Sequence, residues 1–67
     1  MVFVERLREA MTEKSISQEK LGEMVGLSRQ GINSYCNGHR EPSFEILIKI
    51  CKALDVSSDY LLGLKEY

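Results

Sequence analysis

Apolar residues recur at intervals of three and four along this chain, which is the spacing that buries one face of an α-helix. In the first segment these positions are Phe3, Leu7, Ala10 and Met11, and we expect the helix to end near Lys14. Its charged positions are expected to face water: Glu5, Arg6, Arg8, Glu9 and Glu13.

A second helix is predicted to begin after Ser17, whose hydroxyl can accept a hydrogen bond from a backbone N–H of the first turn. Ile16 precedes this N-cap as the apolar residue of a hydrophobic staple. The expected buried face consists of Leu21, Met24 and Val25. Gly26 then ends the helix, because glycine adopts the left-handed conformation after a helix C-terminus without strain.

Ser28 is the expected N-cap of a third helix, in which Ile32, with Tyr35 or Cys36, continues the apolar stripe. Asn37-Gly38 is its expected end. Asn-Gly also favours a β-hairpin turn, but no alternating strand pattern flanks it, so the helix is preferred.

Two further helices are predicted after Pro42. Ser43 caps the first of them, and its expected inner face consists of Phe44, Leu47, Ile48, Cys51 and Leu54. The segment 55–58 is a turn with another N-cap, and a short helix over 59–62 ends at Gly63. The predicted fold class is therefore all-α, with five short helices.

The second and third helices and their glycine-containing turn have the form of a helix-turn-helix, spanning about residues 18–37. Gly22 falls where the two helices are expected to cross, so a side chain there would push them apart. Gly26 makes the turn, and Leu27 anchors it in the core.

This segment, together with GHREPSFEILIKICKALDVSSDYLLG, resembles the Cro and phage-repressor type of helix-turn-helix, the XRE-like family of bacterial and phage transcription regulators. The resemblance covers essentially the whole chain. It implies one compact, five-helix, lambda-repressor-like domain over residues 1–67, with a recognition helix at about 28–37. It also implies sequence-specific binding of double-stranded operator DNA, expected to be palindromic, by a repressor that is a homodimer.

Base reading is expected at the start of the recognition helix, which enters the major groove in this geometry. Arginine can donate two hydrogen bonds to guanine, and glutamine can pair with adenine. By resemblance, Arg29, Gln30 and Ser34 match the family's base-reading positions, and Asn33 is a further candidate. The alternative is that Arg29 is a solvated charge and Gln30 an ordinary surface residue.

Phosphate contacts are expected on both sides of this helix, where they set the register without reading sequence. Gln18 matches by resemblance a position where the family's glutamine holds a phosphate. The other candidates are Ser28, Asn37, His39 and Arg40. His39 can equally be an exposed loop residue without a role. Gly31 is expected to let the helix approach DNA closely, or else to be a neutral substitution at a tolerant surface site.

Charge is unevenly distributed along the chain. The net charge of −1 and pI near 5.8 argue against non-specific attraction to nucleic acid. All ten acidic residues, however, lie outside the segment 27–40, which contains Arg29, His39 and Arg40. We expect the acidic remainder to repel the duplex and so leave a larger share of binding to specific contacts.

Composition excludes several other classes. With 43% hydrophobic and 28% charged residues, the 67-residue chain has the composition of an ordinary globular domain. It lacks a membrane-length apolar run and a signal peptide, so we expect a cytoplasmic protein. Cys36 and Cys51 are expected to be reduced thiols. A single histidine without nearby ligands indicates no metal site, and no cofactor or small-molecule ligand is expected.

Other functions compete with DNA binding as explanations of this sequence. An enzyme needs a pocket with paired acid, base or nucleophilic groups, which this sequence does not indicate. A protein-interaction module with this fold that has lost DNA binding stays open because of Tyr35 and Cys36, as does an antitoxin-like regulator. If the chain dimerises, the expected surface is Tyr60, Leu61, Leu62, Leu64 and Tyr67, although Tyr60 to Leu62 are expected first of all to close the core.

Overall fold

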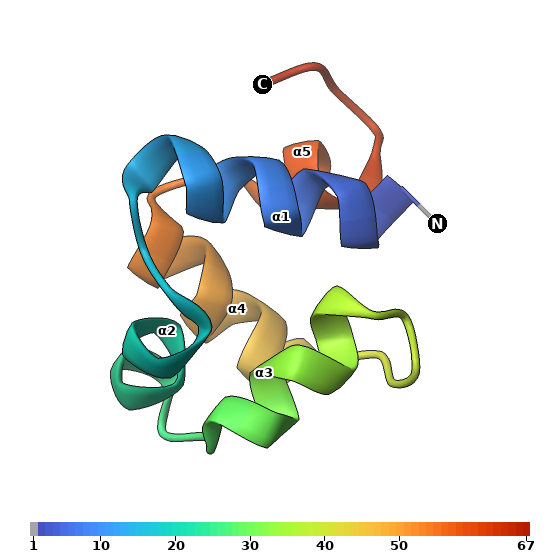
Figure 1. The fold of residues 1–67 in the computed structure, drawn as a ribbon. Helices are drawn as coiled ribbons and strands as arrows, with labels where there is room; N and C mark the ends of the chain where they lie inside the picture. The colour runs from blue at the N-terminus through green and yellow to red at the C-terminus, as the bar shows by residue number, and fades with distance from the viewer. Residues whose placement is uncertain (1) are drawn as a thin grey trace.

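The computed structural model describes residues 2–67. Its five helices are α1 (Val2–Lys14), α2 (Gln18–Val25), α3 (Arg29–Cys36), α4 (Phe44–Leu54) and α5 (Ser58–Leu62). Figure 1 shows α1 and α5 together at one end of the molecule, α3 along the opposite edge and α4 between them. This arrangement confirms the predicted compact, all-α, five-helix fold. None of the helices in the described part of the chain is long and apolar enough to cross a membrane.

Serine hydroxyls start four of these helices. The Oγ atoms of Ser17, Ser28, Ser43 and Ser57 each accept a hydrogen bond, 3.0–3.2 Å long, from the backbone N–H three residues later. Each cap satisfies one of the N–H groups that a helix leaves unpaired at its start. The predicted starts of α2, α3 and α4 are thereby confirmed, whereas α5 begins one residue earlier than predicted, at Ser58 after the Ser57 cap.

A single core lies between the five helices. The predicted buried faces of α1 and α3 are confirmed, and both Tyr35 and Cys36 belong to the face of α3. The buried hydrophobic residues are Phe3, Leu7, Ala10, Met11, Leu21, Val25, Ile32, Tyr35, Cys36, Leu47, Ile50, Leu54 and Leu61.

Two predicted faces are partly wrong. Met24 is 46% exposed, and Gly22 lies on the buried face of α2 instead. In α4, Phe44 and Ile48 are 86% and 54% exposed, whereas Ile50, absent from the prediction, is fully buried. Apolar residues occur on nearly every side of α4, so their spacing does not determine which side faces the core. That choice is made by the packing of α1, α2 and α5 against α4.

The turn between α2 and α3 closes on Gly22. A Cβ atom at Gly22 would lie 2.5 Å from the carbonyl oxygen of Leu27. The backbone N–H groups of Gly26 and Leu27 both donate to the carbonyl oxygen of Gly22, and Gly26 has a φ of 80°. The close neighbour of Gly22 is therefore the turn's backbone, not a crossing helix as predicted. Glycine is needed here to set where α3 begins relative to α2.

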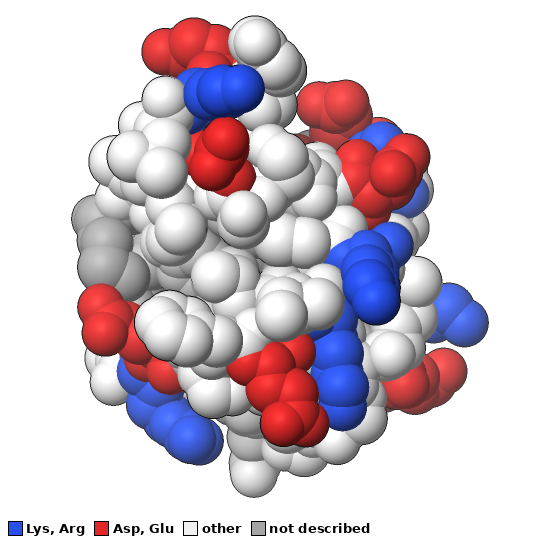
Figure 2. Space-filling model, turned by 180° about the vertical axis from the view of Figure 1, so that it is seen from behind, with Lys and Arg blue, Asp and Glu red and all other residues white. Residues whose placement is uncertain are grey.

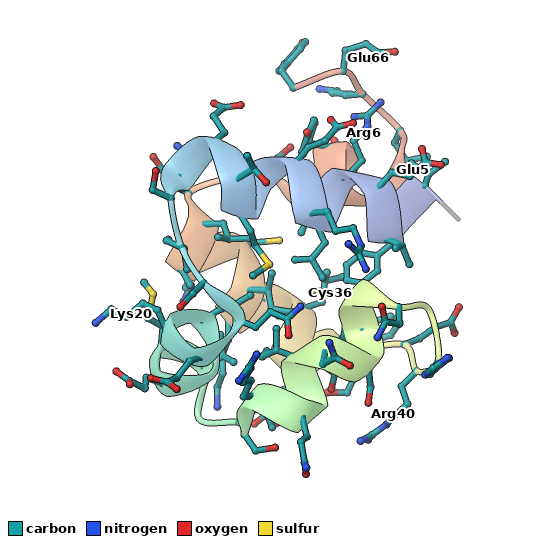
Figure 3. The ribbon with its side chains drawn as sticks, viewed as in Figure 1. Glu5, Arg6, Lys20, Cys36, Arg40 and Glu66 are labelled. Carbon is teal, nitrogen blue, oxygen red and sulfur yellow. The ribbon has the colours of Figure 1, made fainter. Side chains whose placement is uncertain are left out.

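The C-terminal tail is held against α1 at the other end of the molecule. The Arg6 guanidinium donates to the carbonyl oxygens of Tyr60 and Lys65, at 3.2 and 3.0 Å. It also forms an ion pair with Glu66 at 3.2 Å. Figure 3 shows Arg6 and Glu66 together on the side of α1 that faces away from α3. The tail and its charges are thus remote from the edge that α3 occupies.

Candidate nucleic-acid interface

α3 is anchored by one face and presents a polar face to solvent. Ile32 is fully buried on its inner side, while Arg29, Gln30 and Asn33 are exposed. Within residues 2–67, no hydrogen bond or ion pair engages the side chain of Arg29 or of Gln30. Both side chains are therefore available to a ligand, while the backbone that carries them is fixed by the core.

Ser28 and Ser34 form hydrogen bonds within their own helix. Ser28 Oγ accepts from the backbone N–H of Gly31 at 3.1 Å, so its hydroxyl proton can still be donated to an acceptor. Ser34 is half-buried, and its hydroxyl donates to the carbonyl oxygen of Gln30 at 3.1 Å. In this conformation Ser34 offers a ligand an acceptor rather than a donor.

Gly31 is not required by the protein's own packing. A Cβ atom there would lie 3.6 Å from Ser28 Oγ and 3.7 Å from the Cβ of Leu27, which are ordinary contacts. This contrasts with Gly22, where a Cβ would collide with backbone. Within the described residues there is no steric reason for glycine at position 31.

A shallow hollow of about 430 Å³ lies between the N-terminal ends of α2 and α3. It brings the predicted phosphate-binding residue Gln18 together with Arg29 and Asn33, two of the predicted base-reading residues. Ser17 and Glu19 complete its lining, so one acidic side chain stands among these candidates.

The remaining candidates, Asn37, His39 and Arg40, follow the C-terminal end of α3. The backbone N–H groups of His39 and Arg40 donate to the carbonyl oxygen of Ser34, at 2.9 and 3.3 Å. The Arg40 guanidinium lies 5.9 Å from the centroid of the Tyr35 ring. Figure 3 shows Arg40 at the edge of the molecule that α3 forms. His39 is exposed.

Three amide side chains form a hydrogen-bonded row along this edge, which we call the amide row: Gln18, Asn33 and Asn37. Asn37 Nδ2 donates to Asn33 Oδ1 at 2.8 Å, and Asn33 Nδ2 donates to Gln18 Oε1 at 3.1 Å. Asn33, a predicted base-reading residue, is thus hydrogen-bonded on each side to a predicted phosphate-binding residue.

Arg8 of α1 stands at the end of the amide row and was missed from the sequence. Its NH2 group donates to Asn37 Oδ1 at 2.9 Å, and its Nε donates to the carbonyl oxygen of Cys36 at 2.8 Å. The spacing within α1 places Arg8 on the outer side, as predicted. It does not reveal that α3 docks beside it, so no pattern in the sequence identifies this contact.

Cys36 lies beneath this edge as a buried, free thiol. Its Sγ is 3.8 Å from the Sδ of Met11. Burial raises the pKa of the Cys36 thiol, and the nearby charge of Arg8 opposes only part of this shift. Cys36 therefore stays protonated at neutral pH and acts as an apolar core residue. No group of three or more potential metal ligands occurs among residues 2–67.

Comparison with known proteins relates the chain to helix-turn-helix proteins. The family model described as "Helix-turn-helix" matches residues 7–61. The chain is 39% identical over 61 residues to the SPbeta prophage-derived HTH-type transcriptional regulator YonR of Bacillus subtilis, covering 91% of this chain and 56% of that protein. It is 41% identical over 58 residues to repressor protein C2 of Salmonella phage P22, covering 87% and 27%. The chain thus spans about half the length of YonR, and less of C2.

Solved structures extend the likeness to three dimensions. The crystal structure of the P22 c2 repressor in complex with synthetic operator 9T matches with a TM-score of 0.85 and 38% identity, covering 91% of this chain and 92% of that one. The solution structure of the P22 c2 DNA-binding domain matches with a TM-score of 0.88 and 36% identity, covering 100% and 91%.

Proposed function

This chain belongs to the Cro/C1-type helix-turn-helix family, a family of XRE-like transcription regulators and not of enzymes, and we propose that it binds a specific DNA sequence to repress transcription. The observation that most strongly supports this is that α3 exposes a polar face while its opposite face is buried in the core. It occurs in a fold that the P22 repressor uses on its operator. A cytoplasmic location follows from this proposal, because the operator is there.

In the proposed complex, α3 lies in the major groove with its N-terminal turn towards the bases. Arg29 and Gln30 read guanine and adenine respectively, and Asn33 and Ser34 contact base edges deeper along the helix. The predicted phosphate contacts flank them: Gln18 and Ser28 on one side, and Asn37, His39 and Arg40 on the other. Residues 1–67 act as one domain, with the helix-turn-helix over about 18–37.

The structure weakens the case for a protein-interaction module that has lost DNA binding. Tyr35 and Cys36 are the residues that would favour such a module. Both are buried, so they add no apolar surface to the outer face of α3. The exposed residues of α3 are neutral polar or basic, and none is acidic. A surface of this kind suits base edges and phosphates better than an apolar partner.

We further propose that the DNA-binding unit is a homodimer, since one such domain contacts few base pairs. Of the surface predicted for this contact, Leu61 is fully buried, while Leu62, Leu64 and Tyr67 are exposed. Figure 2 shows, on the face turned away in Figure 1, a largely uncharged area bordered by side chains of both charges.

An apolar groove of about 420 Å³ offers a place for the second copy. Its lining includes Val2, Pro42, Phe44 and Leu62, and Phe44 is largely exposed. Pro42 belongs to the loop that follows α3, and we propose that a two-fold axis near this groove places the two copies of α3 against the same side of a duplex. That arrangement is the one that two half-sites a helical turn apart require.

The proposal is tested with the duplex that the purified protein enriches from a random DNA pool. Arg29→Ala is expected to weaken binding by about 1–3 kcal/mol and to relax the preference at one base pair. Arg40→Ala is expected to weaken binding to all sequences alike and to reduce the salt slope by about 1. Unchanged affinity and preference in Arg29→Ala would refute its role in base reading.

A further inference from the structure

We propose that Arg8 is a positioning residue that orients the amide row towards DNA, an inference that rests on the proposed function. Arg8 lies on α1, outside the helix-turn-helix, yet its guanidinium reaches Asn37, at one end of the row, at 2.9 Å. It acts on DNA through Asn37, Asn33 and Gln18 rather than by reading a base itself.

The direction of each hydrogen bond in the row depends on which groups can donate. An arginine side chain has only donors, whereas an amide side chain has one donor end and one acceptor end. Asn37 must therefore turn its oxygen towards Arg8, which leaves its NH2 group for Asn33. Asn33 in turn presents its oxygen to Asn37 and its NH2 group to Gln18. One fixed donor thus sets the direction of every hydrogen bond in the row.

This direction determines what the row offers to DNA. Gln18 uses its oxygen to accept from Asn33, so both N–H groups of its amide remain free to donate to a phosphate oxygen. If the row ran the other way, Gln18 would donate one N–H to Asn33, keep only one for phosphate, and expose its oxygen, which phosphate oxygens repel. Asn33 likewise keeps one N–H for a base acceptor. Without Arg8, both directions become accessible, and part of the population has the orientation that binds phosphate less well.

Arg8 is itself held in place, as a positioning residue must be. Its Nε donates at 2.8 Å to the carbonyl oxygen of Cys36, in the last turn of α3. A cation is favourable at this end of a helix, where the unpaired carbonyl groups carry partial negative charge. Two hydrogen bonds from one planar group thus connect α1 to the C-terminal end of α3.

A double-mutant cycle on the enriched duplex tests the inference. Arg8→Met is expected to weaken binding about 3- to 10-fold, as it would if only about a third to a tenth of the molecules kept the orientation that binds well. In a Gln18→Ala background the same change is expected to cost less than about twofold, because its effect passes through Gln18. Arg8→Lys is also a pure donor and is expected to bind within about twofold of the wild type. Lys14→Met, which removes one exposed positive charge from α1 outside the row, is the matched control.

Several results would overturn the inference. If the effects of Arg8→Met and Gln18→Ala simply multiply, or if Lys14→Met weakens binding as much as Arg8→Met, Arg8 acts through charge or fold and not through the row. NMR of the free protein supplies an independent readout: Arg8→Met is expected to shift the side-chain amide resonances of Gln18 as well as Asn37. If the Gln18 resonance does not shift in Arg8→Met while DNA binding is retained, the role of Arg8 in the row is refuted and the proposed function still holds. If no duplex is enriched from the pool, the proposed function itself is refuted.

Discussion

Replacing Gly31 by alanine distinguishes what the fold needs at the start of α3 from what DNA needs there. A Cβ at this position makes only ordinary contacts, 3.6 Å from Ser28 Oγ and 3.7 Å from Leu27 Cβ. The cap is retained, because it uses the backbone N–H of residue 31. Alanine in place of glycine within a helix stabilises by about 0.5–1 kcal/mol. For a domain of this size the melting temperature is then expected to rise by about 2–8 °C.

DNA binding is expected to change in the opposite sense. If the bare backbone of Gly31 approaches a base edge or phosphate, the added methyl group holds α3 away from the groove. We expect at least about tenfold weaker binding to the enriched duplex, or about 1.4 kcal/mol. Thermal unfolding by circular dichroism and titration by fluorescence anisotropy measure the two effects on one preparation. A variant that is more stable and binds as tightly as the wild type would refute the close approach and leave Gly31 as a neutral substitution.

Three further predictions follow from the geometry. Gly22→Ala is expected to destabilise the fold by about 1–3 kcal/mol in urea unfolding, because its Cβ would lie 2.5 Å from the carbonyl oxygen of Leu27; a neutral effect would show that the turn can relax. Burial raises the pKa of Cys36 above its ordinary value of 9.0, which favours the neutral thiol in the folded state, so this stability is present below pH 9.0 and is lost as pH rises further. Urea unfolding between about pH 8 and about pH 10 should show this decline, and Cys36→Ala should flatten it relative to the wild type. Phe44→Ser is expected to leave the monomer folded and to lower the dimer fraction in analytical ultracentrifugation with the enriched duplex, whereas an unchanged fraction would exclude the apolar groove.

The helix boundaries were predictable because they depend on local chemistry. Each serine cap needs only its own hydroxyl and a backbone N–H three residues away, and Gly26 needs only its own backbone freedom. The buried face of α1 was equally predictable, since its apolar residues recur at helical spacing and charged residues occupy the positions between them. Information of this kind is contained within a few consecutive residues.

Features that depend on docking between helices were not predictable. α4 carries apolar residues on most of its sides, so the choice of Ile50 over Ile48 for the core is made by the neighbouring helices. Arg8 and Asn37 are 29 residues apart, and only the packing of α1 on α3 brings them together. The reason for Gly22 was likewise misassigned, because the path of the turn backbone is not written in residue spacing. The DNA contacts themselves remain predictions from resemblance and from the exposure of α3.

Selection from a random duplex pool by the purified protein tests whether α3 reads a specific DNA sequence. Affinity for the enriched duplex and for random DNA should be measured at several salt concentrations. We expect a roughly palindromic site, bound ~10³-fold or more above random DNA. Absence of any enriched sequence, with only weak binding that disappears as salt rises, would contradict it and favour the protein-interaction module.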